Sequence, residues 1–283
     1  MPGLFKKISY TAFLLIFISC SEQAPIDNDD KITIAVTITP YKYLVQKIAE
    51  DYVNVVSSIP EGATPHHFEP TPKLIRSISS ASYYFKVGRY MEFEDIWLQK
   101  LKGINKGMTV FDLSDSVSYS NNDPHIWLSP VKLKLISKNI LNALTEILPG
   151  ESTRFRNNYN HFVDSLETIT KHLENSFANI DDKKKVLLVY HGSWKYFAED
   201  FGFRQISIEE GSKSASAKEF KEILNVVRKS NVKVIFIDPQ HSRQSAEVIA
   251  KDLKIVTDVI NPLPDNLLEN FYSIENKILA YYK

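Results

Sequence analysis

Residues 151–179, ESTRFRNNYNHFVDSLETITKHLENSFAN, decide the fold. This stretch contains no Pro or Gly, and its large apolar side chains recur at three- and four-residue spacing, as on one face of an α-helix: Phe155, Tyr159, Phe162, Leu166, Ile169 and Leu173. At about 1.5 Å per residue it would span roughly 43 Å, which is long for a helix inside one compact domain. We therefore predict a long helix that connects two parts of the chain.

Short β-rich runs alternate with helical stretches on both sides of this connector. Before it, we predict strands over residues 32–38, 53–59, 83–87 and 109–113 and helices over 41–51, from 72 onward and over 130–148. After it, we predict strands over residues 185–190, 205–208, 233–237 and 255–257 and helices over 193–201, 217–229, 242–253 and 265–282. Thr71-Pro72 and Ser129-Pro130 each join an N-cap residue to Pro at the first helical position. Two such blocks indicate an α/β fold with two parallel-sheet lobes.

We accordingly expect an N-terminal α/β lobe over residues 31–148, a linking helix over 149–180 and a C-terminal α/β lobe over 181–283. The 283 residues are 43% hydrophobic and 24% charged, which excludes a largely disordered chain and a polytopic membrane protein. A formal net charge of zero argues against a nucleic-acid binder. One cysteine excludes an internal disulfide framework, and no glycine-rich phosphate-binding motif occurs.

The first thirty residues have the pattern of a secretory signal. Two lysines precede an apolar run over residues 12–18 that is too short to span a bilayer, and Cys20 follows it. This pattern resembles a bacterial lipoprotein signal, in which the cysteine is lipidated and becomes the new N-terminus, although Phe17 stands where Leu is usual. We predict a signal peptide over residues 1–19 and a lipidated tether over 20–30. Plain secretion with cleavage nearby is the alternative.

Four histidines follow the carboxyl ends of predicted strands: His66, His125, His191 and His241. Ligands bind at that edge of open α/β sheets, and a cleft shared by the two blocks could gather these side chains. Neutral imidazole is a good zinc ligand, but a lone histidine is more often an ordinary surface or hydrogen-bonded residue. We take that ordinary interpretation for His161 and His172 on the connector helix. Since adjacent residues in an extended loop point opposite ways, at most one of His66 and His67 should be a ligand.

Three motifs resemble those of one protein family. Residues 62–70, GATPHHFEP, resemble a G-x-x-P-H-x-x-E-P loop, and residues 123–127, DPHIW, resemble a D-P-H-x-W motif. His191, followed by Trp194 and Phe197, resembles a third ligand segment. In this order and at this spacing they make the chain similar to the zinc- and manganese-binding lipoproteins of ABC importers, the cluster A-I solute-binding proteins. The resemblance extends from Lys31 to the C-terminus.

The resemblance implies two α/β lobes joined by a long rigid helix, with a metal cleft between the lobes. It implies metal ligands at three positions: His66, His125 and His191. The family's fourth ligand is often an Asp, where this chain has Asn261, and a neutral amide is a poor zinc ligand. The ligand at the fourth metal position therefore stays open, and the candidates are water, Asn261, His241 and Asp258.

The implied function is capture of a divalent metal ion by a protein anchored on the extracytoplasmic side of a membrane. The partner would be the membrane permease of an ABC importer, and we expect the binding protein to be a monomer. Three nitrogen ligands without a firmly placed carboxylate favour Zn²⁺ over Mn²⁺. Residues 114–122 contain no histidine, so the His-rich loop of many zinc-binding members is absent.

Two other classes of function remain open. Three histidines and a water also form catalytic zinc sites, and a zinc hydrolase would need a general base such as Glu69, Glu209 or Glu210. No H-E-x-x-H motif occurs, and we expect no enzymatic activity. A metal-binding adhesin lipoprotein is the other alternative, and its binding to host or matrix would be indifferent to metal.

Overall fold

The computed structural model describes residues 31–210, 213–214 and 216–282. The predicted signal peptide over residues 1–19, Cys20 and the tether over 20–30 lie outside the described residues, so they stay predictions. Lys31–Lys283 form one compact unit. Within the described part of the chain, no helix has both the length and the apolar character needed to cross a membrane.

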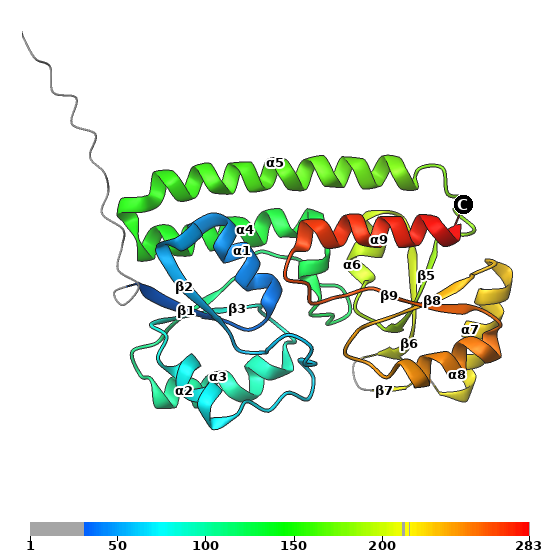
Figure 1. Cartoon of the computed structure of the whole chain (residues 1–283), viewed down its shortest axis with the longest axis horizontal. Helices are drawn as coiled ribbons and strands as arrows, with labels where there is room; N and C mark the ends of the chain where they lie inside the picture. The colour runs from blue at the N-terminus through cyan, green and yellow to red at the C-terminus, as the bar shows by residue number, and fades with distance from the viewer. Residues whose placement is uncertain (1–30, 211–212, 215, 283) are drawn as a thin grey trace, which may run out of the picture. The chain divides into compact units, whose positions relative to one another are not determined.

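The N-terminal sheet has four parallel strands in the order β2-β1-β3-β4. Its strands are β1 (Ile32–Val36), β2 (Val53–Ser57), β3 (Tyr83–Lys86) and β4 (Thr109–Asp112). Its helices are α1 (Thr39–Ala49), α2 (Pro72–Ser79), α3 (Glu92–Ile104) and α4 (Pro130–Ile147). Helices α1 and α4 lie on one side of the sheet, and α2 and α3 lie on the other (Figure 1). This sheet and these helices are the N-terminal lobe.

The C-terminal sheet has the order β7-β6-β5-β8-β9, and all its pairs are parallel except β6 with β7. Its strands are β5 (Val186–His191), β6 (Arg204–Glu210), β7 (Lys213–Ser214), β8 (Val234–Ile237) and β9 (Val256–Val259). Its helices are α6 (Lys195–Asp200), α7 (Ala217–Lys229), α8 (Arg243–Leu253) and α9 (Leu267–Tyr282). These elements are the C-terminal lobe. The predicted class, two parallel-sheet lobes with a long helix, is confirmed, with the short antiparallel β7 as an addition.

Both faces of the C-terminal sheet are covered, which explains why residues 186–189 of its central strand β5 are all apolar. Successive side chains of a strand point to opposite faces. Leu187 and Val189 of β5 accordingly belong to one core cluster with residues of α9, whereas Val186 and Leu188 belong to another with residues of α7 and α8. A parallel strand buried on both faces reads as a continuous apolar run, as residues 186–189 do.

The predicted helix starts at two proline positions are confirmed. The hydroxyl of Thr71 accepts a hydrogen bond from the backbone N–H of Leu74 at 3.3 Å, and Pro72 is the first residue of α2. Ser129 caps α4 in the same way through the N–H of Lys132 at 3.0 Å. A capping hydroxyl satisfies an N–H group that has no partner within the helix, which is why these short motifs predict helix starts well.

The connector helix is α5 (Ser152–Phe177), with 26 residues. Its buried residues belong to one continuous core cluster that also contains residues of both lobes: Phe155, Phe162, Leu166, Ile169, Leu173 and Phe177. The amide of Asn158 donates to the carbonyl of Ile48 in α1, and His172 Nε2 lies 2.9 Å from a carboxylate oxygen of Glu275 in α9. The helix therefore packs on both lobes (Figure 1). The exact lobe boundaries at 148–149 and 180–181 stay predictions.

Helix α3 was missing from the sequence predictions. Its N-cap residue, Met91, makes no side-chain capping hydrogen bond, so the usual start signal is absent. Its first turn carries the buried Glu94, whose carboxylate accepts hydrogen bonds from the backbone N–H groups of Val87 and Gly88 at 2.6 and 3.1 Å. Burial raises the pKa of Glu94 to about 7, while these hydrogen bonds and that from Thr37 lower it. The helix thus holds the chain just after β3.

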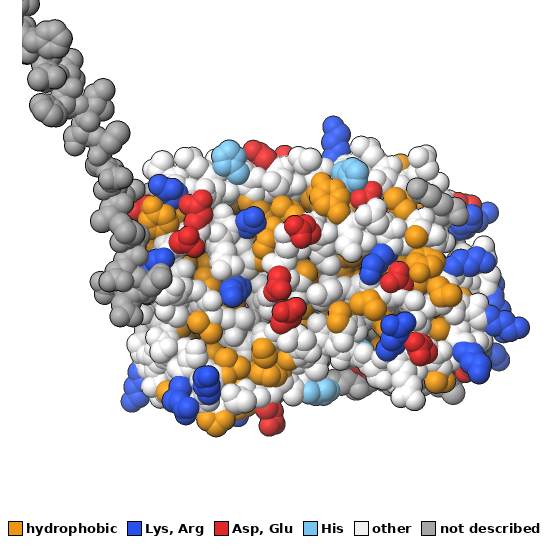
Figure 2. All heavy atoms as spheres, in the orientation of Figure 1, with side chains coloured by type: hydrophobic (Ala, Val, Ile, Leu, Met, Phe, Trp, Pro, Cys, Tyr) orange, Lys and Arg blue, Asp and Glu red, His pale blue; other side chains and the backbone are white. Residues whose placement is uncertain are grey.

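Acidic and basic side chains lie side by side over most of the face shown in Figure 2. This distribution agrees with the formal net charge of zero. A nucleic-acid interface usually gathers one sign of charge into a patch or stripe, which most of this face does not show.

We predict that Leu166→Ala destabilises the protein by about 2–5 kcal/mol, because Leu166 is fully buried on α5 and its removal leaves a cavity. Lys171→Ala, at an exposed position of the same helix, should change stability by less than about 0.5 kcal/mol. Urea unfolding followed by circular dichroism measures both changes. Equal, small effects would show that α5 does not contribute to the core as described.

Candidate metal centre

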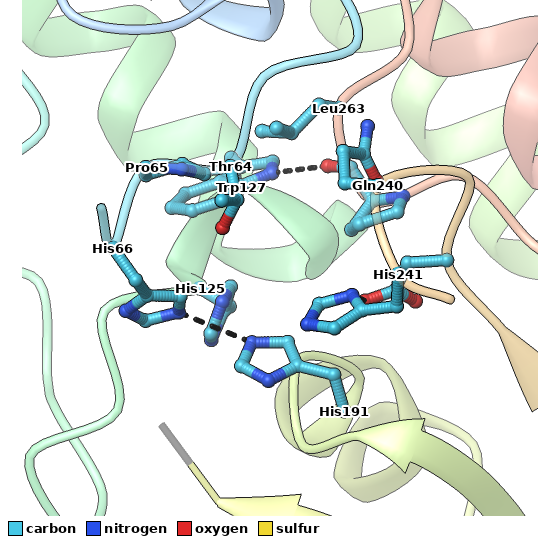
Figure 3. Close-up of a pocket in the computed structure, with 11 residues that line it drawn as sticks. Thr64, Pro65, His66, His125, Trp127, His191, Gln240, His241 and Leu263 are labelled. Atoms are coloured by element: carbon cyan, nitrogen blue, oxygen red, sulfur yellow. Dashed lines mark hydrogen bonds and ion pairs between the residues drawn. The ribbon is translucent and has the colours of Figure 1, made fainter. Parts of the chain in front are cut away.

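Four histidines lie at the carboxyl-terminal edges of the two sheets, as predicted. His66 is in the loop after β2, and His125 follows β4 and precedes the short 3₁₀ helix η2 (Ile126–Leu128). His191 is the last residue of β5, and His241 lies in the turn between β8 and α8. All four line one pocket, so the two lobes supply two histidines each (Figure 3).

Three of these side chains point toward one another (Figure 3). One ligand atom from each of His66, His125 and His191 lies within 4.8 Å of the other two. The Nε2 atoms of His66 and His191 are 3.2 Å apart, although the residues are 125 positions apart in the sequence. Tetrahedral zinc with Zn–N distances of about 2.0–2.1 Å places neighbouring ligand atoms about 3.3–3.4 Å apart. His66 and His191 are therefore spaced like two ligands of one ion, and His125 lies within reach as a third.

A carboxylate faces the Nδ1 atom of each of these rings. Oε2 of Glu92 lies 3.4 Å from His66 Nδ1, and Oδ1 of Asp123 lies 2.6 Å from His125 Nδ1. Oε1 of Glu209 lies 3.9 Å from Nδ1 of His191, a longer approach. A carboxylate at Nδ1 favours the tautomer with its proton there and leaves the Nε2 lone pair for a metal.

Local contacts hold the loop before η2 in place. The backbone N–H of His125 donates to Asp123 Oδ1 at 2.9 Å, so one carboxylate binds both the backbone and the ring of His125. The indole N–H of Trp127 donates to the carbonyl of Pro262 at 2.7 Å, which connects η2 to the segment after β9. Trp127 is 1% exposed, so this bond lies in the core beside the pocket.

Two histidines of the pocket have shifted pKa values, in opposite directions. The pKa of His66 is lowered, first by burial and then by the nearby His125, while Glu92 and its hydrogen bond raise it. A lowered pKa keeps the imidazole neutral near pH 7, and only the neutral ring has a lone pair to donate. On the other side of the pocket, the nearby carboxylate of Asp238 raises the pKa of His241, against the effect of burial.

Of the protein groups predicted for a fourth metal position, only His241 lines the pocket. The side-chain oxygen of Asn261 accepts a hydrogen bond from the backbone N–H of Leu263 at 3.0 Å. Asp258 lies 3.4 Å from Lys277 Nζ and 3.3 Å from the hydroxyl of Tyr281. The structure therefore brings neither Asn261 nor Asp258 to the three histidines.

The histidines assigned ordinary roles lie outside this pocket. His67 is exposed next to His66, and His161 is exposed on α5. His172 is paired with Glu275, as described above. Glu69 is exposed and does not line the pocket either.

Sequence reasoning named Glu209 as a candidate carboxylate but assigned no role to Glu92, Asp123 or Asp238. Asp123 stands two residues before His125 in the DPHIW motif, and that spacing is the one signal that could have identified its role. Glu92 reaches His66 only through the tertiary fold, and Asp238 reaches His241 through a turn. No sequence motif identifies either carboxylate.

One known protein family matches most of this chain. The sequence model of the family described as "ZnuA: Zinc-uptake complex component A periplasmic" matches residues 34–278. A crystal structure of ZnuA superimposes with a TM-score of 0.84 at 30% sequence identity, covering 90% of this chain and 100% of that one.

Two curated relatives carry metal-binding names. A putative metal-binding protein of Chlamydia trachomatis is 26% identical over 269 residues, covering 93% of this chain and 96% of its own length. The zinc-binding lipoprotein AdcA of Streptococcus pneumoniae is 26% identical over 304 residues, covering 98% of this chain. The match spans only 59% of AdcA, so AdcA is the longer protein.

We predict that Glu92→Gln lowers the pKa of His66 further below its ordinary value of about 6.5, because the Glu92 carboxylate raises it. His125→Ala should raise the pKa of His66, because His125 lowers it. Side-chain NMR titration of the metal-free protein measures both shifts. Glu69→Gln, at an exposed position of the loop that holds His66, is the matched control and should leave the pKa of His66 unchanged. A rise in the His66 pKa on Glu92→Gln would contradict the assigned contact.

Proposed function

This chain belongs to the family of periplasmic zinc-uptake components, the ZnuA family, and from that premise we propose that it captures a divalent metal ion and delivers it to an ABC importer. The observation that carries the proposal is the cluster of three imidazoles at the edges of two lobes. The metal is cargo, so the site has to bind and release rather than transform it. We infer that the chain is not an enzyme, since its family consists of uptake components.

We propose His66, His125 and His191 as the metal ligands, each binding through Nε2. The support is their mutual spacing and the carboxylate that faces each Nδ1. We assign the fourth position to a water molecule, because Asn261 and Asp258 have other partners and His241 has its nitrogens directed to Glu209 and Asp238. Three protein ligands and one exchangeable ligand suit an ion that has to leave again.

Zn²⁺ is the cargo that we propose. Imidazole nitrogen suits zinc, whereas Mn²⁺ prefers carboxylate, carbonyl and water oxygens. Carboxylates are present, but in the proposed arrangement they face Nδ1 rather than the metal. Their negative charge would still partly offset the charge of the bound ion and make the imidazoles more basic.

We also propose that the mature chain is anchored at Cys20 on the extracytoplasmic side of a membrane and contacts a membrane permease there. The signal-like pattern of residues 1–19 and the position of Cys20 support the anchor. The relative AdcA is itself a lipoprotein by name. The pairing with a permease follows from the uptake role of the family.

His66→Ala, His125→Ala and His191→Ala should each weaken Zn²⁺ binding at least about tenfold, or about 1.4 kcal/mol, because each removes a nitrogen ligand. Titration calorimetry at about pH 7.5 measures the loss, and uptake of radiolabelled zinc by cells should fall with it. Competition with Mn²⁺ in the same experiment tests the choice of metal. Stronger binding of Mn²⁺ than of Zn²⁺ would overturn that choice.

His67→Ala and His161→Ala serve as matched controls for this series, because both side chains are exposed and lie outside the pocket. They should bind Zn²⁺ nearly as well as the unmodified protein. Equal losses for His66→Ala and His67→Ala would mean that the ligand assignment in this loop is wrong.

Cys20→Ala should abolish lipidation and release the mature protein from the membrane fraction, because no described helix could replace the anchor. Fractionation and mass spectrometry of the N-terminus measure the two effects. Ser21→Ala, next to the proposed anchor, is the control and should stay membrane-bound. Membrane retention of a correctly cleaved Cys20→Ala protein would refute the anchor.

A further inference from the structure

A second group of metal-binding side chains adjoins the first and shares His191 with it. One ligand atom from each of His191, Glu209 and His241 lies within 4.8 Å of the other two. All three residues belong to the C-terminal lobe, at the end of β5, near the end of β6 and in the turn after β8. The proposed three-histidine site needs both lobes, whereas this group needs only one.

The distances within this group resemble those between ligands of one ion. Oε1 of Glu209 lies 3.5 Å from Nε2 of His241 and 3.9 Å from Nδ1 of His191. Both separations exceed the 2.7–3.2 Å typical of N–H···O hydrogen bonds. The His241–Glu209 distance comes close to the separation of about 3.3–3.4 Å between neighbouring ligands of tetrahedral zinc, and the His191–Glu209 distance exceeds it by about 0.5 Å. A small inward movement of the Glu209 side chain would complete the ligand spacing.

The rings of His191 and His241 are arranged to face the same carboxylate. They stack with centroids 4.9 Å apart and an angle of 21° between their planes, and Figure 3 shows His241 beside His191. Oδ2 of Asp238 lies 3.5 Å from Nδ1 of His241 and is almost completely buried. A carboxylate at Nδ1 favours the proton there, so in the neutral ring the lone pair of His241 is on Nε2, which faces Glu209.

We propose that His191, Glu209 and His241 form a second position for a divalent metal ion, carried wholly by the C-terminal lobe. The proposal rests on the metal-binding function proposed above and deepens it. Two imidazole nitrogens and one carboxylate oxygen form a donor set that zinc accepts. His191 would bind through Nδ1 here and through Nε2 in the three-histidine site.

The two positions are alternatives for one ion. A neutral imidazole carries a proton on one nitrogen and a free lone pair on the other, so His191 serves one position at a time. Among the described residues, these two groups contain three donors from the C-terminal lobe and two, His66 and His125, from the N-terminal lobe. The C-terminal lobe would therefore hold the ion when His66 and His125 do not bind it.

The test removes both donors of the N-terminal lobe and asks whether zinc still binds. His66→Ala/His125→Ala in the full chain should bind one equivalent of Zn²⁺ by calorimetry, more weakly than the unmodified protein. Adding Glu209→Gln or His241→Ala to this pair should weaken the remaining binding at least about tenfold. The unmodified protein should also bind one equivalent.

Two substitutions in the same background are matched controls. Glu222→Gln lies on an exposed position of α7, and His161→Ala lies on an exposed position of α5. Neither should alter the remaining zinc binding. Circular dichroism of every variant checks that it is folded, and His66→Gln/His125→Gln replaces the alanine pair if that pair does not fold.

Three results would overturn the inference. The first is a folded double variant that binds no zinc while the unmodified protein does. The second is zinc binding by the double variant that neither Glu209→Gln nor His241→Ala weakens. Two equivalents in the unmodified protein would refute alternative occupancy. If the unmodified protein itself binds no divalent metal, the proposed function fails instead, so the two failures are distinguishable.

Discussion

The continuous apolar core along α5 is the interaction on which the rest of the structure depends. Side chains of α5 belong to one buried cluster with residues of both sheets and of α4 and α9. Because protein interiors are densely packed and hardly compressible, such a core fixes the position of one lobe relative to the other. The spacing between His66 and His191, which stand on different lobes, is therefore set by packing far from either ring.

Carboxylates lie behind the three histidines and influence which ring nitrogen carries the proton. His125 and His191 are buried. Neutral rings suit metal binding, but a neutral ring can carry its proton on either nitrogen. Glu92 and Asp123 face the Nδ1 atoms of His66 and His125 and so direct Nε2 of these rings toward the shared centre, whereas Glu209 lies 3.9 Å from Nδ1 of His191.

The two lobes contribute unequally to the pocket. Each ligand of the N-terminal lobe has a carboxylate partner of its own, Glu92 or Asp123. In the C-terminal lobe, Glu209 lies between His191 and His241, and Asp238 lies behind His241. The C-terminal side therefore places a carboxylate and a second imidazole beside the shared His191, which is the basis for a second metal position there.

Sequence alone was sufficient to predict the elements whose signals are local. The periodic apolar face of α5, the Thr71-Pro72 and Ser129-Pro130 helix starts and the placement of histidines after strands all depend on neighbouring residues, and the structure confirms them. Helix α3 lacked a capping signal and was missed. Only the tertiary structure decided that His241 lines the pocket while Asn261 and Asp258 do not, because those positions depend on which distant residues bind their side chains. The same holds for Glu92 at His66: hydrogen bonds and ion pairs act over a few ångströms, and only the folded chain brings such residues that close.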